Sequence, residues 1–176
     1  MTERAGVEVR PATEADVAAL TDVYNEVIRT SDAIWLDDEV TVEDRLAWLR
    51  SLRPDDACLV ATDADGTFLG YAACFPFRDK SGYWPTVELT IMVASSARGT
   101  GVGTTLLQAL IDHATAVGRR VMVAGTDAAN LGSIRLHERF GFREVARMPG
   151  VGRKRGRPVD LVLLQLDLPG PDRRAS

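Results

Sequence analysis

A glycine-rich turn between a strand-like run and a helix-like run constrains this chain more than any other feature. Residues 86–93 alternate apolar and polar side chains, as a β-strand does, and residues 104–117 have the apolar spacing of a helix. Between them lie Gly99, Gly101 and Gly103. Glycines let the backbone approach a ligand closely, and the start of a helix adds unpaired N–H groups with a partial positive charge. The turn therefore predicts a cradle for a pyrophosphate, with an ordinary glycine-rich turn as the alternative.

Three kinds of phosphate-binding loop compete for this turn, and the neighbouring residues separate them. A P-loop needs a lysine directly after its last glycine, but Thr104 follows Gly103. A dinucleotide-binding loop of the Rossmann type needs a further glycine at position 106, which is Leu106. The pattern that remains is Arg-x-x-Gly-x-Gly, formed by Arg98, Gly101 and Gly103.

This pattern resembles the coenzyme A loop of the GNAT superfamily of N-acetyltransferases. A second motif of that superfamily, a helix that starts with Asn-x-x-Ser and ends with Gly-Phe, matches residues 130–142. Further pieces are similar to the branch that acetylates phosphinothricin and methionine sulfoximine. These pieces are residues 9–12, 30–35, 86–88 and 136–138 and the late Gly152-x-Lys154, and all the matches together span residues 7–168.

The resemblance implies an α/β fold of the GNAT type. Its centre is a mixed, mostly antiparallel, twisted sheet of about seven strands, splayed between strands 4 and 5, with helices on both faces. Apolar spacing and turn residues predict elements in a matching order. Strands are predicted at 7–10, 58–62, 67–75, 86–93, 121–124, 142–146 and 159–166, and helices at 13–28, 41–52, 104–117 and 131–139. We expect a single domain over residues 1–168 and a disordered tail over 169–176.

The resemblance also implies where acetyl-coenzyme A binds as a co-substrate. Its pantetheine arm would bond to exposed strand backbone at Ile91, Met92 and Val93. Asn130 and Ser133 would reach the pantetheine and the sulfur end. Backbone N–H groups would hold the pyrophosphate, and they belong to Arg98, Gly99, Thr100, Gly101, Val102, Gly103 and Thr104.

Glu88 and His137 are the candidates for the chemistry of acetyl transfer. The amine must be neutral to attack, and the leaving thiolate benefits from a proton donor. Glu88 is the one carboxylate within the alternating strand, where partial burial would raise its pKa and make it a base, directly or through water; the alternative is a solvated glutamate. The resemblance implies that His137 lies near the thioester sulfur, as a proton donor or as a cofactor contact. A lone helical histidine is also typical of a structural position.

The substrate pocket follows from the resemblance alone. In that branch the amino-acid pocket is lined by segments that correspond to Trp35, Phe77, Arg78, Tyr83 and Val87 of this chain. Arg78 would pair with a substrate carboxylate in bidentate fashion. The alternatives are a solvated charge for Arg78 and a core position for Trp35.

One segment departs from the branch. Where the branch carries aromatic residues after Lys154, this chain has Arg155, Gly156, Arg157 and Pro158. The missing aromatic lining argues against phosphinothricin itself as the substrate. The added positive charge suits a more acidic or a larger substrate, unless the segment is a solvated turn.

Composition and charge argue against several classes of binding partner and indicate the cellular location. The net charge of −4 argues against a nucleic-acid partner, because phosphate neutralisation needs clustered cationic excess. Two histidines, and two cysteines without CxxC spacing, argue against a zinc site, so no metal is expected. The N-terminal residues contain no apolar signal-like region, and no run approaches about 18 apolar residues. We therefore expect no membrane partner and a reducing, cytoplasmic location, in which Cys58 and Cys74 are buried free thiols.

These features together predict transfer of an acetyl group from acetyl-coenzyme A to the amine of a small molecule, an amino acid or an analogue. The resemblance adds a homodimer, in which residues 147–160 reach the active site of the partner. Two alternatives stay open. One is a GNAT enzyme that acetylates a protein N-terminus or lysine, and the other is a catalytically silent module that senses acetyl-coenzyme A.

Overall fold

The fold of this protein, taken from a computed structural model that describes residues 6–169, is built on one seven-stranded sheet. The strands lie in the order β1-β2-β3-β4-β5-β7-β6. All neighbours are antiparallel except β4 and β5, which are parallel. This confirms the expected mixed, mostly antiparallel sheet. The tail expected over residues 169–176 lies outside the described residues except for Pro169.

The helices and strands keep the predicted order. The strands are β1 Glu8–Pro11, β2 Ala57–Thr62, β3 Phe68–Pro76, β4 Thr86–Val93, β5 Val121–Asp127, β6 Arg143–Lys154 and β7 Arg157–Asp167. The helices are α1 Val17–Thr30, α2 Val42–Ser51, α3 Val102–Ala116 and α4 Leu131–Glu138. Thr13 and Thr41 form capping boxes, because each threonine exchanges hydrogen bonds with the aspartate three residues later.

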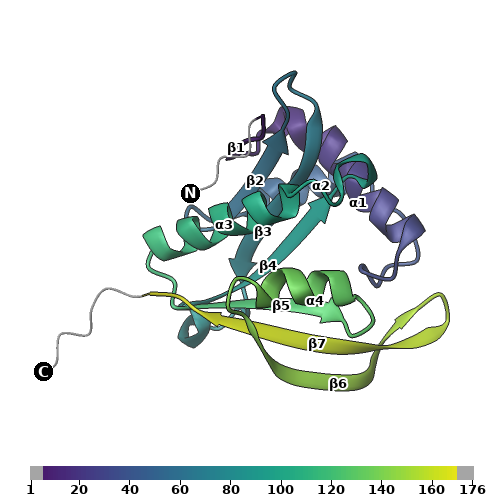
Figure 1. The fold of residues 1–176 in the computed structure, drawn as a ribbon, viewed down its shortest axis with the longest axis vertical. Coiled ribbons are helices and arrows are strands. Elements are labelled where there is room, and N and C mark those ends of the chain that lie inside the picture. The colour runs from purple at the N-terminus through teal and green to yellow at the C-terminus, as the bar shows by residue number, and fades with distance from the viewer. Residues whose placement is uncertain (1–5, 170–176) are drawn as a thin grey trace, which may run out of the picture.

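The helices cover both faces of the sheet. In Figure 1, α3 and α4 lie in front of the sheet, and α1 and α2 lie against its other face. Each face has its own hydrophobic core. Buried leucines of α3 fill the core on one face, and Leu20 of α1 and Tyr71 of β3 belong to the core on the other. Val87 of β4 belongs to the α3 core and Met92 to the α1 side. Because side chains alternate along a strand, Glu88 also faces the side of α1 and α2.

The β6–β7 hairpin is much longer than predicted. The sequence-based prediction gave a strand only at 142–146, whereas the observed β6 also includes Pro149 and Gly150. β6 continues through them, since a register shift between Met148 and Gly152 takes up the extra residues as an irregularity in the pairing. Gly150 has φ +64, and its backbone N–H donates to Asp160 Oδ1 at 2.8 Å. Proline is tolerated here because β6 is an edge strand.

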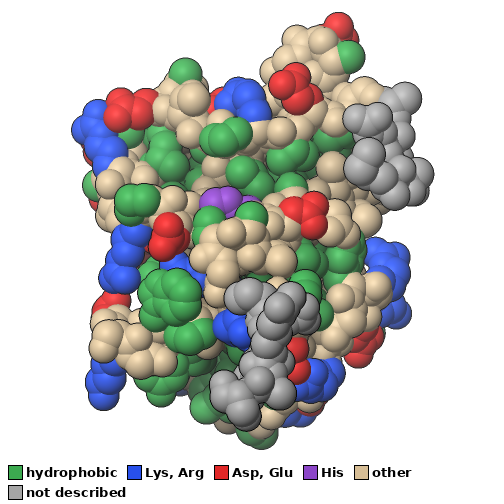
Figure 2. Space-filling view, turned by 90° about the vertical axis from the view of Figure 1, so that its left-hand side faces the viewer, with side chains coloured by type: hydrophobic (Ala, Val, Ile, Leu, Met, Phe, Trp, Pro, Cys, Tyr) green, Lys and Arg blue, Asp and Glu red, His purple; other side chains and the backbone are tan. Residues whose placement is uncertain are grey.

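The two cysteines agree with the sequence-based expectation of buried free thiols. Cys58 and Cys74 are both free and buried, and burial raises the pKa of Cys58 to about 12 and that of Cys74 to about 11. Figure 2 shows Lys and Arg side chains interspersed with Asp and Glu on the face drawn there. In residues 6–169, none of the helices has the length and apolar character needed to cross a membrane.

Candidate active site

The central strands β4 and β5 part from one another halfway along. Their parallel pairing runs from Thr86 opposite Val121 to Leu89 opposite Ala124 and then stops, although β4 continues to Val93 and β5 to Asp127. β4 stays paired with β3 on its other side. The backbone of β4 after Leu89 therefore has one edge that bonds to no strand, and this edge lines a cavity of about 900 Å³.

The glycine-rich turn closes one end of this cavity. Gly99 has φ +75 and Gly101 has φ +96, and this left-handed backbone is strongly disfavoured for most other residues. Gly101 caps α3, so the first N–H groups of the helix lack partners within it. Of the predicted loop residues, Arg98, Gly99, Gly101, Gly103 and Thr104 line the cavity. Thr100 and Val102 do not, and Val102 packs in the core.

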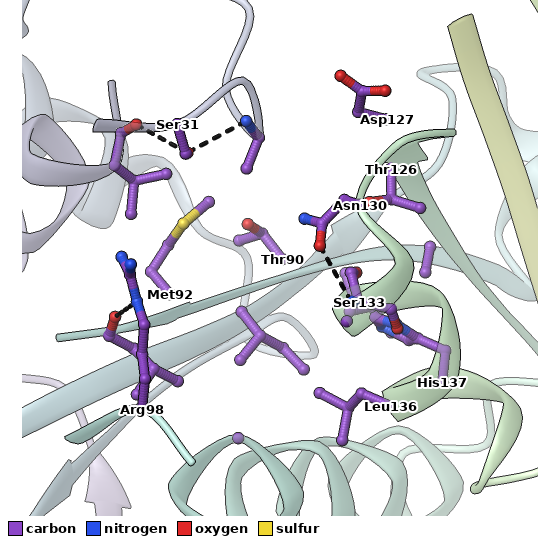
Figure 3. Close-up of a pocket in the computed structure, with 18 of the residues that line it drawn as sticks. Ser31, Thr90, Met92, Arg98, Thr126, Asp127, Asn130, Ser133, Leu136 and His137 are labelled. Carbon is purple, nitrogen blue, oxygen red and sulfur yellow. Dashed lines mark hydrogen bonds between the residues drawn. The ribbon is translucent and has the colours of Figure 1, made fainter. Parts of the chain in front are cut away.

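The start of α4 forms the opposite side. Asn130 caps this helix, because its Oδ1 accepts a hydrogen bond from the Ser133 backbone N–H at 3.1 Å. Figure 3 shows Asn130, Ser133 and His137 across the cavity from Met92, with Thr90 between them. The structure thus brings together Ile91, Met92 and Val93 with residues of α4, as the resemblance implied.

His137 carries an unpaired nitrogen beside the cavity. Its Nδ1 lies 2.8 Å from the Ser133 carbonyl oxygen, and its ring packs edge-on against Phe142 at 5.1 Å. A carbonyl can only accept, so Nδ1 carries the proton and the neutral ring presents a lone pair at Nε2. Nε2 is buried and has no partner within the described part of the chain. Burial lowers the pKa of His137, against the opposing effect of the Ser133 hydrogen bond, so the ring is neutral near pH 7.

Glu88 lies at the point where β4 and β5 part. Its Oε1 is 3.6 Å from the position that a Cβ of Gly125 would take, and Gly125 lines the cavity. The Glu88 side chain is half-buried. Burial raises the pKa of Glu88, and the positive charge of Arg78 acts in the opposite direction. The carboxylate is therefore placed next to the gap, although Glu88 is not among the residues that line the cavity. Its raised pKa is a shift in the direction that favours a role as a base.

The other predicted substrate residues lie further from the cavity. Phe77 and Tyr83 meet edge-on at 6.0 Å, and the exposed guanidinium of Arg78 lies over the Phe77 ring at 4.9 Å. Trp35 packs against β6. Val87 is fully buried on the α3 face, so its side chain points away from Glu88. None of these five residues lines the cavity as the structure describes it.

Two stretches of the cavity wall were missed by the sequence-based prediction. One is Ser31–Ala33, which belongs to a segment similar to the branch, but only Trp35 in that segment was singled out. The other is the end of β5, residues 125–127, which lies beyond the strand predicted at 121–124. Asp127 here is 7% exposed, and its carboxylate accepts the Ala129 backbone N–H at 2.8 Å.

The arginines that depart from the branch bind within the protein. Arg155 and Arg157 pair with the two carboxylate oxygens of Asp32, at 3.4 Å and 3.1 Å. The guanidinium of Arg155 also donates to the Arg29 carbonyl oxygen at 2.6 Å. These arginines therefore contact the end of α1 and the wall residue Asp32, and the segment is more than a solvated turn.

The residues present fit acetyl-coenzyme A. A thioester arm needs unpaired strand backbone, which β4 offers beyond Leu89. The phosphates need close-approaching glycines and cations, and Gly99, Gly101 and Arg98 provide these. The orphaned His137 Nε2 provides a polar contact inside the cavity. Across residues 6–169, no His, Cys, Asp and Glu side chains gather into a group that could hold a metal.

Comparison with known proteins agrees with this arrangement. Residues 20–142 match the model of the acetyltransferase (GNAT) family. The L-methionine sulfoximine/L-methionine sulfone acetyltransferase of Salmonella typhimurium is 40% identical over 160 residues, which cover 91% of this chain and 94% of that protein. A solved phosphinothricin acetyltransferase from Sinorhizobium meliloti, in complex with acetyl-coenzyme A, has a TM-score of 0.88 and 31% identity and covers 92% and 88% of the two chains. A ribosomal-protein-alanine N-acetyltransferase structure from Brucella melitensis has a TM-score of 0.88 and 41% identity, covering 92% and 99%. The chain belongs to the GNAT family of acetyltransferases.

Proposed function

We propose that this enzyme transfers the acetyl group of acetyl-coenzyme A to the primary amine of a small amino acid or amino-acid analogue. The observation that carries the proposal is the gap between β4 and β5, with Glu88 next to the point where the strands part and the buried His137 in the wall of the cavity. Relatives with amino-acid-like substrates in their names cover most of the chain, which supports a small acceptor.

In the proposed reaction Glu88 takes one proton from the substrate ammonium, directly or through water. The neutral amine attacks the thioester carbonyl, so that a C–N bond forms and the C–S bond breaks. The nitrogen then gives up its second proton and the sulfur leaves with the thioester electron pair and gains a proton. The products are the amide, the coenzyme A thiol and one proton released to solvent from Glu88. Holding the two reactants in one geometry supplies much of the acceleration.

We further propose that His137 acts as a hydrogen-bond acceptor rather than as the proton donor implied by the resemblance. Its Nδ1–H is engaged by the Ser133 carbonyl, so a neutral ring has only a lone pair to offer at Nε2. Protonation of Nε2 is disfavoured because burial lowers the pKa of His137. The proton for the sulfur would then come from the amine or from water.

The test is a panel of amines assayed for release of the coenzyme A thiol. It contains methionine sulfone, methionine sulfoximine, phosphinothricin and a peptide with an N-terminal alanine. We expect turnover with at least one free amino acid analogue. Turnover of the peptide alone would favour the protein-acetylating alternative. The peptide is included because the similar protein from Brucella melitensis is named as a ribosomal-protein-alanine N-acetyltransferase. Binding of acetyl-coenzyme A without turnover of any amine would favour the silent sensing module.

We also propose that the enzyme works as a homodimer in the cytoplasm. β6 is a long edge strand that exposes Val145, Met148 and Val151, and such an edge is prone to pair with a second chain. The buried free thiols Cys58 and Cys74 suit a reducing compartment. Light scattering at working concentration should give the mass of two chains, and a monomer would contradict the proposal and the expected contribution of residues 147–160 to a partner's site.

A further inference from the structure

The end of the β6–β7 hairpin contacts the segment that connects α1 to α2. Lys154, the last residue of β6, is 1% exposed, and its Nζ donates to the carbonyl oxygens of Ile28, at 3.0 Å, and Leu36. Ile28 lies in the last turn of α1, where carbonyls lack partners within the helix and carry a partial negative charge. A buried ammonium is costly unless its donors are satisfied, so these bonds tie the hairpin to the end of α1 and to the middle of the connecting segment.

Two neighbours of this lysine contact the same segment. A Cβ built on Gly152 would lie 2.2 Å from Cε3 of Trp35, so the indole ring occupies the space that any side chain would need. The backbone N–H of Arg155 donates to Asp37 Oδ1 at 2.9 Å. Residues 31–41 form neither a helix nor a strand. The hairpin contacts therefore take the place of a regular backbone hydrogen-bond pattern in fixing the path of the segment.

The segment held in this way supplies part of the cavity wall. Ser31, Asp32 and Ala33, here called the acceptor wall, line the cavity, whereas Lys154 and Gly152 do not. Figure 3 shows Ser31 on the side of the cavity opposite Asn130. The predicted contacts of acetyl-coenzyme A lie on β4, the glycine-rich turn and α4, so the acceptor wall is left to the incoming amine.

We propose that Lys154 and Gly152 are positioning residues that fix the acceptor wall and thereby set the affinity for the amine substrate. This inference rests on the proposed function of the cavity. Neither residue lines the cavity of its own chain, and both act there through the segment they hold. Removing the ammonium would leave the Leu36 carbonyl without this donor and the Ile28 carbonyl with only the Arg155 guanidinium, at 3.2 Å. Poorly satisfied buried groups of this kind are relieved by movement of the backbone that carries them.

The variant Lys154→Met keeps the length and packing of the side chain and removes its donors. We expect the KM for the amine to rise by about tenfold or more with little change in kcat, the signature of lost ground-state contacts. The KM for acetyl-coenzyme A should stay within about twofold, because its predicted contacts are on other elements. The matched control is Arg143→Met, which removes an exposed cation at the other end of β6 and should change neither constant. Hydrogen exchange of the amides of residues 31–37, measured without substrate, should be faster in Lys154→Met only.

The outcomes separate positioning from a general loss of structure. Equal rises in both KM values, or an unchanged amine KM with unchanged exchange, would overturn the proposal. If the wild-type enzyme acetylates no amine, the proposed function fails, and the exchange measurement still decides whether Lys154 holds the wall. If Lys154→Met does not fold, Arg155→Gly serves instead, because it removes a surface guanidinium from the same segment and suits the φ of +48 at that position. Gly152→Ala, which displaces Trp35, should raise the amine KM in the same selective way.

Discussion

Replacing Glu88 with glutamine tests the assignment of the general base most directly. Glutamine keeps the shape and the hydrogen-bonding capacity of the side chain but cannot take up a proton. Burial raises the pKa of Glu88, which means that the surroundings favour an uncharged group at this position. Glutamine is as large as glutamate, and Oε1 lies 3.6 Å from the position that a Cβ of Gly125 would take, so the amide fits beside this glycine. We therefore expect the variant to fold, with a Tm no lower than that of the wild type.

The expected effect of this change is on kcat and on its pH dependence. Loss of a positioned base lowers kcat by about 10²- to 10⁴-fold, or about 3 to 5 kcal/mol of barrier. The affinity for acetyl-coenzyme A should hardly change, because its predicted contacts are strand backbone and the glycine-rich turn. The wild-type rate should rise with pH as Glu88 loses its proton, at a pH above the usual carboxylate range because its pKa is raised. That rise should vanish in the glutamine variant, leaving only the deprotonation of the amine.

The assay is steady-state release of the coenzyme A thiol at saturating amine, followed across the pH range in which the enzyme is folded. Glu8→Gln is the matched control, since Glu8 is an exposed strand glutamate on β1, at the far edge of the sheet. A kcat for Glu88→Gln within about fivefold of the wild type would refute the reasoning. Glu88 would then be a strand residue beside the site, and the enzyme would act by positioning a substrate that arrives deprotonated.

Three further changes test other parts of the structure. Gly101→Val forces a branched side chain into a φ of +96, and calorimetry should show acetyl-coenzyme A binding weakened by about tenfold or more in a folded variant. His137→Phe should lower kcat/KM. It should also change how stability depends on pH: because the pKa of His137 is lowered in the folded protein, the wild type loses stability as the pH falls below about 6.5, where the unfolded histidine takes up a proton. Denaturant unfolding at several pH values should show that this part of the loss is absent in the variant. Asp16→Asn should cost about 1 kcal/mol at pH 7, because the Arg10 hydrogen bonds lower the pKa of Asp16 to about 2. That difference from the wild type should disappear as the pH of the unfolding titration falls from about 4 towards 2.

The parts of the site that the sequence predicts are those whose signals are local. β4 was predicted with the bounds it has, because its alternation is unbroken over eight residues. The glycine-rich turn was predicted because left-handed backbone at Gly99 and Gly101 demands glycine whatever surrounds it. The cap of α4 by Asn130 lies three residues from its partner, Ser133. In each case the cause and its consequence fall within one element and the turn next to it.

The acceptor side is different, because contacts between residues far apart in the chain decide it. Lysine is among the residues least often buried, so nothing in the pattern around Lys154 predicts a side chain that is 1% exposed. Its burial depends on the α1 carbonyl of Ile28, 126 positions away. Arg155 is a second case of a contact between distant residues. From the sequence its charge could be interpreted as a determinant of substrate charge, but in the structure its guanidinium donates to the carbonyl of Arg29. Substrate preference in this chain would then follow from how the hairpin holds the acceptor wall, as well as from which side chains line it. The KM values for the amine and for acetyl-coenzyme A in Lys154→Met test that distinction. If only lining side chains set the preference, a change outside the cavity leaves both values unchanged, whereas a positioning role raises the KM for the amine alone.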